Sequence, residues 1–274
     1  RRELIRYAAK CKAPQYGLLW PPHHDDVGNY NYSVEHTEFF RDGGLWESEQ
    51  GQFFLEWYSG MLIRHGDAVL ARAQEAFKGT DIVLAAKVAG IHWQSKTKSH
   101  GPELTAGYFN TINRNGYLPI ADMFARRKVM FDFTCLEMQN SELPEWALSA
   151  PADLVLQTQQ AAHAAGCAYA GENALPRFDR AGFLQMHHQC ENQGRGITSF
   201  TYLRLGEHVM DEKNWFQFAR FAAEMKSGFK LATWAAPPRS KQCRRQHVTH
   251  HLDIEHHDLS RMAKLLRFGG RQII

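Results

Sequence analysis

The sequence predicts an α/β fold in which helices alternate with parallel strands. After residue 50, runs with apolar residues at helical spacing alternate with short apolar runs rich in β-branched and aromatic residues. Strands separated by helices pair in parallel through right-handed crossovers. Polar side chains that can take part in chemistry fall at or just past the ends of the predicted strands. This placement is typical of sheets whose ligands bind beyond the carboxyl ends of the strands.

The elements can be assigned in order from these runs. Residues 1–17 have the pattern of the end of a helix, not of a signal or transit peptide, and we expect the chain to be cut from a longer protein. The later predicted helices cover residues 52–77, 116–127, 152–166, 179–194 and 212–228. The predicted strands cover residues 81–93, 128–138, 167–173 and 196–204. Asp179 is the expected N-cap of its helix, because its carboxylate can accept a hydrogen bond from the first turn.

The polar residues at the strand ends favour a (β/α)8 barrel, in which only the carboxyl ends of the strands and the following loops open onto a ligand. These residues are Lys87, His92, Thr134, Glu137, Glu172, Asn173 and Arg204. A doubly wound sheet would show the same polarity. However, neither G-x-G-x-x-G nor G-x-x-x-x-G-K-[ST] occurs in the chain. The sequence therefore predicts about four βα units of a TIM barrel, with sheet edges that would be free to pair.

The composition excludes several classes of protein. At 44% hydrophobic and 22% charged residues, the chain is ordinary for a globular protein. The net charge of +3 is small and much of the excess follows Lys226, so the body is not expected to bind nucleic acid. No apolar stretch reaches the roughly 18–20 residues of a membrane span, and we expect a soluble protein. The five cysteines are odd in number and form no C-x-x-C pair, so neither a disulfide framework nor a metal site is predicted.

Several runs of the sequence resemble one family. They read GGLWESEQGQFFLEWYSGMLIRHGD (43–67), GIHWQSKTKSHGPELTAGYFNT (90–111), FTCLEM (133–138), GENALPRFD (171–179) and FTYLRL (200–205). In this order they resemble the C-terminal half of the β-amylases, which are inverting, exo-acting α-1,4-glucan hydrolases. Several long runs in family order are more specific than one short motif. The resemblance implies that residues 1–231 are the C-terminal portion of a β-amylase-like barrel, with no metal or organic cofactor.

The resemblance implies that Glu172 is the general base, which takes a proton from the attacking water. In the family, the general acid is a glutamate in a GELRYPSYP-type segment, which has no counterpart in this sequence. An inverting glycosidase needs both groups, about 6.5–9.5 Å apart. Positioned proton transfer contributes roughly 10²–10⁴-fold. We therefore expect this chain alone to be inactive, and we expect Glu137 to support the base, not to replace the acid.

The resemblance also implies a set of glucan-binding residues, namely Lys87, His92, Trp93, Thr134, Asn173, Ala174, Leu175 and Arg204. Lys87 would donate to a sugar hydroxyl, Trp93 would stack on a sugar, and Thr134 would lie on a mobile inner loop. Taken alone, His92 could instead be a hydrogen-bonded core histidine, and Arg204 could pair with a carboxylate. Gln94 stands where a second aromatic residue is common in the family, which leaves an outer subsite open.

Residues 232–274 depart from the family pattern and form a basic, histidine-rich tail. Pro237 and Pro238 mark a linker, and the cluster RSKQCRRQ could contact phosphate, although short charged runs are usually solvated. The histidines between residues 247 and 257 include helical i, i+3 and i, i+4 spacings. No H-E-x-x-H motif accompanies them, so a metal site is not favoured.

The predicted function is release of β-maltose from the non-reducing ends of α-1,4-glucans such as starch, by inverting acid/base catalysis. The first alternative is a non-catalytic, glucan-binding or regulatory β-amylase-like protein. A second is a half barrel that self-associates to complete a barrel, and nucleic-acid binding through the tail is the least favoured. Plastid and cytoplasm are both open as compartments, and the sequence leaves the oligomeric state undetermined.

Overall fold

The computed structural model describes residues 1–18, 32–191, 196–227, 267–268 and 271–272. Most of the predicted tail, residues 232–274, lies outside the described residues. Within it, β5 (Arg267–Phe268) and β6 (Arg271–Gln272) pair antiparallel. The boundary between a barrel portion and a separate tail therefore stays a prediction.

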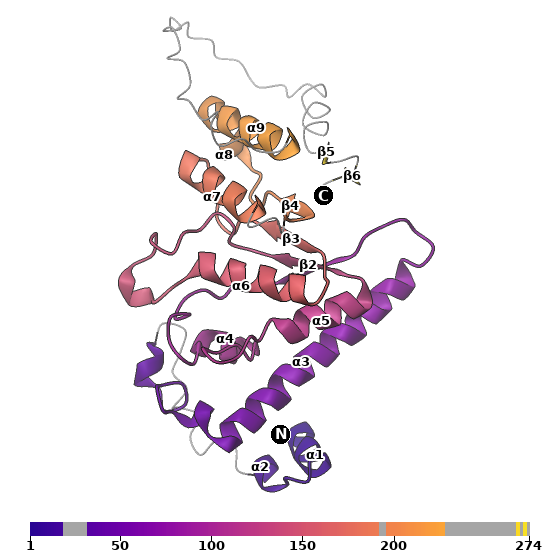
Figure 1. Cartoon of the computed structure of the whole chain (residues 1–274), viewed down its shortest axis with the longest axis vertical. Coiled ribbons are helices and arrows are strands. Elements are labelled where there is room, and N and C mark those ends of the chain that lie inside the picture. The colour runs from indigo at the N-terminus through magenta and orange to yellow at the C-terminus, as the bar shows by residue number, and fades with distance from the viewer. Residues whose placement is uncertain (19–31, 192–195, 228–266, 269–270, 273–274) are drawn as a thin grey trace, which may run out of the picture.

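The centre of the fold is a parallel sheet with the strand order β1-β2-β3-β4 (Figure 1). Its strands are β1 (Ala85–Val88), β2 (Met130–Phe133), β3 (Tyr169–Glu172) and β4 (Ser199–Thr201). Each lies inside a predicted strand but is shorter, because the residues flanking it lie outside the ladder. The predicted α/β class and the four parallel strands are confirmed.

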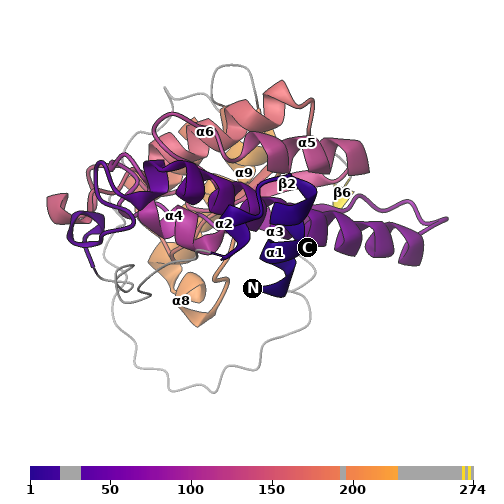
Figure 2. The ribbon, with the colours of Figure 1, turned by 90° about the horizontal axis from the view of Figure 1, so that it is seen from below.

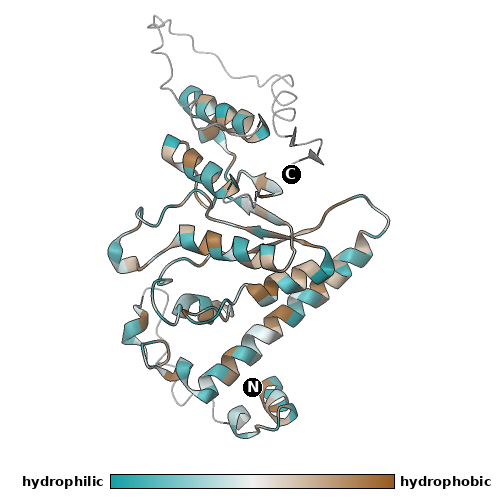
Figure 3. Ribbon diagram, in the orientation of Figure 1, coloured by the Kyte–Doolittle hydropathy of each residue, from teal (hydrophilic) through white to brown (hydrophobic). Residues whose placement is uncertain are grey.

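Helices connect and flank the strands. They are α1 (Arg2–Lys10), α2 (Gln15–Leu18), α3 (Glu49–Ala76), α4 (Gly101–Ala106), α5 (Leu118–Arg127), α6 (Pro151–Ala164), α7 (Arg180–Glu191), α8 (Glu207–Met210) and α9 (Glu212–Ser227). Short 3-10 turns span Val34–His36, Leu45–Glu47 and Glu145–Ala147. Figures 1 and 2 both place α1 and α2 beside α3. Hydrophilic and hydrophobic residues alternate along the longer helices (Figure 3), as expected for helices that cover a sheet.

Helix boundaries follow from local capping. The Ser48 hydroxyl accepts from Gly51 N at 3.0 Å, so α3 begins three residues before its predicted start. Asp179 Oδ1 accepts from Gly182 N at 3.0 Å, which confirms Asp179 as the predicted cap of α7. The predicted helix over residues 1–17 is interrupted, because Lys12 adopts a left-handed φ of 58° before Pro14.

The two faces of the sheet differ in chemistry. On one face, Phe131, Phe133, Tyr169 and Phe200 join the main apolar core, against which α5 and α6 pack. On the other face, Lys87, Asp132, Ala170 and Ser199 occupy one row of register partners. Side chains alternate between faces along a strand, so Glu172, two residues after Ala170, shares the polar face. The apolar face holds the fold together, and the polar face carries the predicted chemistry.

Replacing Gly171 with alanine is expected to destabilise the sheet beside Glu172. A Cβ on Gly171 would lie 2.3 Å from Leu136 Cδ2, and Leu136 is fully buried. Overpacking of this kind costs about 1–3 kcal/mol in the free energy of unfolding, measurable by urea denaturation. The control is Gly66→Ala in α3, where the new Cβ meets only the Met123 methyl at 3.4 Å. That variant should be neutral or gain up to about 1 kcal/mol from helix propensity. Equal stability of the two variants would contradict the clash.

Candidate active site

Glu172 is the last residue of β3, and its side chain is almost fully buried. Its Oε2 forms an ion pair with Lys87 Nζ from β1, and the same Nζ lies 3.7 Å from Asp132 Oδ2 on β2. The Lys87 side chain is 47% exposed, so the ammonium sits at the surface of the site with its carboxylate partners beneath it. Lys87, which is predicted to contact sugar hydroxyls, is thus ion-paired with Glu172, the predicted general base.

Asp132 was missed by the sequence analysis. Burial raises the pKa of the Asp132 carboxyl to about 6, the Lys87 ammonium opposes this rise, and the charge of Glu172 adds to it. Oδ1 of Asp132 is buried and has no hydrogen-bond partner among the described residues. A carboxylate alone within the apolar run VMFDF was the signal that could have drawn attention to it.

Glu137 fixes the loop that follows Glu172. It is fully buried and accepts hydrogen bonds from Ala174 N, at 3.0 and 2.9 Å to its two oxygens, and from Leu175 N at 2.6 Å. Burial raises the pKa of the Glu137 carboxyl, and the N–H groups of Leu175 and Ala174 oppose that rise. The carboxylate therefore acts as a backbone acceptor, an arrangement compatible with the supporting role expected for it.

Asn173 ties the loop after β3 to the loop after β4. Its side chain is fully buried, and Nδ2 donates to the carbonyls of Leu175 and Leu203, both at 2.9 Å. Its Oδ1 accepts from Leu203 N at 2.7 Å. The next residue, Arg204, is exposed with a left-handed φ of 70°, and its Nε donates to Ala174 O at 3.4 Å. Leu175 is 49% exposed. The predicted residues of these two loops thus lie together beside Glu172.

His92, Trp93 and Thr134 lie on the loops that follow β1 and β2. His92 Nδ1 lies 2.8 Å from Ser149 Oγ, and burial lowers the pKa of His92. The rings of His92 and Trp93 meet edge to face with their centroids 5.7 Å apart. A Cβ on Gly90 would lie 2.9 Å from Thr134 Cγ2, so the glycine allows the two loops to approach closely. The structure brings these loops together, and their glucan contacts stay a prediction.

Gln94, which stands at the open outer subsite, is a buried loop residue. It adopts a left-handed φ of 58°, its side chain is buried, and its backbone N donates to Ala147 O at 2.8 Å. Its Oε1 is buried without a hydrogen-bond partner in the described part of the chain. The residue therefore anchors its loop to the loop after β2 and presents no exposed surface for a sugar.

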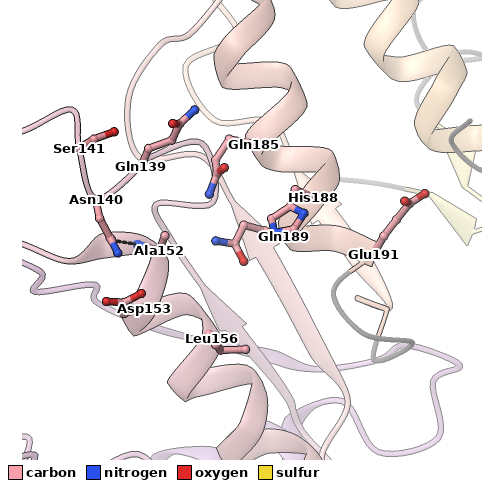
Figure 4. A pocket seen from close by; sticks show the side chains of 10 residues that line it. All are labelled: Gln139, Asn140, Ser141, Ala152, Asp153, Leu156, Gln185, His188, Gln189 and Glu191. Carbon is pink, nitrogen blue, oxygen red and sulfur yellow. Dashed lines mark hydrogen bonds between the residues drawn. The ribbon is translucent and has the colours of Figure 1, made fainter. Parts of the chain in front are cut away.

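A pocket of about 740 Å³, lined mostly by residues with polar side chains, lies between the loop after β2 and helices α6 and α7 (Figure 4). Its walls include Asp153, Gln185 and His188, and Asn140 Oδ1 accepts from Ala152 N at 2.9 Å beside it. None of the predicted site residues lines this pocket. Across the described ranges, no three His, Cys, Asp or Glu side chains gather as metal ligands. No helix in the same ranges is long and apolar enough to cross a membrane.

Comparisons of the sequence with known proteins point to one family. Residues 14–231 match the model of glycosyl hydrolase family 14. The chain is 45% identical over 224 residues to Beta-amylase 1, chloroplastic, of Arabidopsis thaliana, covering 78% of this chain and 38% of that protein. It is 42% identical over 209 residues to the Beta-amylase of Glycine max, covering 73% of this chain and 42% of that protein. The chain thus spans less than half the length of these relatives.

A solved structure agrees at the level of the fold. The catalytic domain of beta-amylase from Paenibacillus polymyxa is similar with a TM-score of 0.61 and 24% sequence identity, covering 80% of this chain and 51% of that one. The parallel four-stranded sheet is consistent with part of that domain. With the match of the family model over residues 14–231, the chain belongs to glycosyl hydrolase family 14.

Proposed function

We propose that this chain supplies the general base of a β-amylase active site that releases β-maltose from the non-reducing ends of α-1,4-glucans with inversion. The observation that carries the proposal is Glu172, held at the carboxyl end of β3 by Lys87. Glu172 would take a proton from the water that attacks the anomeric carbon. The relatives named Beta-amylase support starch-type glucans as the substrate, and the chloroplastic names among them support the plastid as the compartment.

The remaining predicted residues would form the walls of the same site. Arg204 and Leu175 would contact the glucan beside Glu172, from the loops that Asn173 joins. His92 and Trp93 would contact the next sugar, with the rings already fixed edge to face. Thr134 would move with its loop as the product leaves. No cofactor takes part in this scheme, since proton transfers between carboxyl groups, water and sugar suffice.

The general acid would come from outside these residues. Protonation of the leaving oxygen needs a carboxylic acid on the opposite side of the sugar from the base. Glu137 is a poor substitute, because it is fully buried and its oxygens already accept N–H groups from Ala174 and Leu175. The chain alone would hold a base without its acid, and its activity would require the upstream half of a barrel.

The proposal is tested by comparing the chain with a chimera. The chimera joins the part of the Arabidopsis relative that precedes the matched region to this chain. Both are incubated with soluble starch, and proton NMR reads the anomer of the released maltose. We expect β-maltose from the chimera and none from the chain alone, because base catalysis without the acid leaves an unprotonated leaving group.

Other results would favour other functions. β-Maltose from the chain alone, lost on Glu172→Gln, would mean that Glu137 or self-association supplies an acid. Gel filtration would separate these cases, because self-association requires a dimer. A folded chimera that binds maltoheptaose without cleaving starch would contradict hydrolysis and favour the glucan-binding alternative.

A further inference from the structure

The indole of Trp146 is exposed to solvent near the candidate site. The residue is 77% exposed, more than any other large apolar residue in the part of the chain that the structure describes. It is the middle residue of the 3-10 turn Glu145–Ala147, which lies in the connection from β2 to α6. Figure 1 shows this turn at the outer edge of the fold, just before α6. Connections that follow the carboxyl end of a strand are where an α/β barrel binds its ligands.

Hydrogen bonds join this turn to the loop that carries predicted sugar contacts. Gln94 N donates to the carbonyl of Ala147, the residue directly after Trp146, at 2.8 Å. Further along the same connection, Ser149 Oγ lies 2.8 Å from His92 Nδ1. Because His92 is predicted to contact a sugar, the exposed indole belongs to a segment that is bonded directly to the candidate site.

The backbone on both sides of Trp146 is fixed. Ala147 N donates to Pro144 O at 3.0 Å, which closes the turn around Trp146. Leu148 adopts a left-handed φ of 45° and ends the turn. A tryptophan side chain has few rotatable bonds, so a ligand that packs against it restrains little motion. The turn therefore presents a large apolar surface that a ligand can cover with a small loss of conformational entropy.

The chemistry of an indole face matches that of a sugar ring. The faces of a glucopyranose ring carry C–H groups, whereas its hydroxyl groups point outward from the edge of the ring. A flat aromatic ring can therefore cover one face of the sugar and release water from both apolar surfaces. Gln94, whose side chain is buried, offers no such surface. An exposed aromatic ring is supplied instead by Trp146, on the connection that Gln94 N contacts.

We propose that Trp146 binds the outer sugars of a long α-1,4-glucan, beyond the sugars that His92 and Trp93 would contact. The inference rests on the proposed function for the class of ligand, and it adds a residue that selects long chains over short ones. Maltose would occupy the site beside Glu172 and would not reach Trp146. Maltoheptaose would extend past His92 and place one ring on the indole.

Glucan binding to the full chain tests the proposal. A sample with ¹⁵N-labelled indoles is titrated with maltoheptaose, and Trp146→Ala identifies the Trp146 resonance, which should move as the glucan is added. Trp146→Ala should raise the Kd for maltoheptaose about 2–10-fold, because one ring contact is lost, and should leave the Kd for maltose unchanged. Trp146→Phe should retain most of the affinity, since it keeps an aromatic face. Phe77→Ala is the matched control: Phe77 is 48% exposed but precedes β1, at the amino end of the sheet, and its loss should change neither Kd.

A Trp146 resonance that does not move would overturn the proposal, as would an equal Kd for maltoheptaose in the unmodified chain and in Trp146→Ala. Equal losses of maltose and maltoheptaose affinity in that variant would contradict an outer position and overturn it as well. Urea denaturation of Trp146→Ala should match that of the unmodified chain, because the residue is exposed. A lower midpoint would mean that the indole packs within the protein, which would also overturn the proposal. Binding needs no hydrolysis, so failure of the proposed function, seen as absence of maltose release by the chimera, is distinguishable from failure of this inference.

Discussion

Glu172→Gln is expected to lower the rate of β-maltose release by the chimera about 10²–10⁴-fold. Glutamine keeps the size of the side chain and can still meet Lys87 through its carbonyl oxygen, but it cannot accept the proton of the attacking water. The loss should appear in kcat with little change in KM, because the missing interaction belongs to the transition state. Initial rates from reducing-end assays over a range of maltoheptaose concentrations separate the two constants.

The control for this loss is Glu75→Gln, which removes one carboxylate from the exposed surface of α3. It should leave kcat unchanged, because Glu75 lies outside the candidate site and an exposed substitution of this kind changes the free energy of unfolding by no more than about 0.5 kcal/mol. If Glu172→Gln retained more than a tenth of the activity, Glu172 would not be the base and the proposed function would lose its central residue.

Glu137→Ala is expected to lower the free energy of unfolding by about 2–5 kcal/mol, because hydrogen bonds to a buried charged acceptor contribute about 1.5–3 kcal/mol each. The variant leaves the N–H groups of Ala174 and Leu175 without their acceptor. The chimera should lose activity too, since the loop that directly follows Glu172 is no longer fixed. Urea denaturation of the chain measures the first effect, and maltose release by the chimera measures the second.

Glu142→Ala is the matched control, because Glu142 lies in the same connection but pairs with Arg177 at 2.9 Å near the surface. Ion pairs of that kind contribute up to about 1 kcal/mol. A loss for Glu137→Ala no larger than that for Glu142→Ala would mean that water replaces the carboxylate at the loop, and the supporting role would be contradicted.

The order of helices and strands could be predicted because each class of element has its own spacing of apolar residues. The strand ends could not, since residues such as Ala89 and Gly90 continue the composition of β1 but have no partner in the ladder. Helix α4 was not predicted as a separate element, because six residues that include a proline are too few to show a period. Lys12 and Pro14 interrupt a helix that apolar spacing alone would continue.

In the site, the position of Glu172 at a strand end could be predicted, but its partners could not. The pairing of Lys87 with Asp132 depends on the register of β1 against β2, and register is a property of the folded sheet. The engagement of Glu137 with Ala174 and Leu175 depends likewise on two loops that are far apart in sequence. Contacts across strands can therefore be assigned only from the folded structure, whereas residue types at strand ends can be identified from the sequence.

The Asn173 side chain, which bonds both the N–H and the C=O of Leu203, has a thermodynamic consequence. A loop that is immobile before its ligand arrives loses little conformational entropy on binding, so more of the contact energy appears as affinity. The loop with Arg204 is joined in this way to the residue after Glu172. The entropy of ordering this part of the site is lost when the chain folds, so under the proposed function a glucan would bind without ordering this loop.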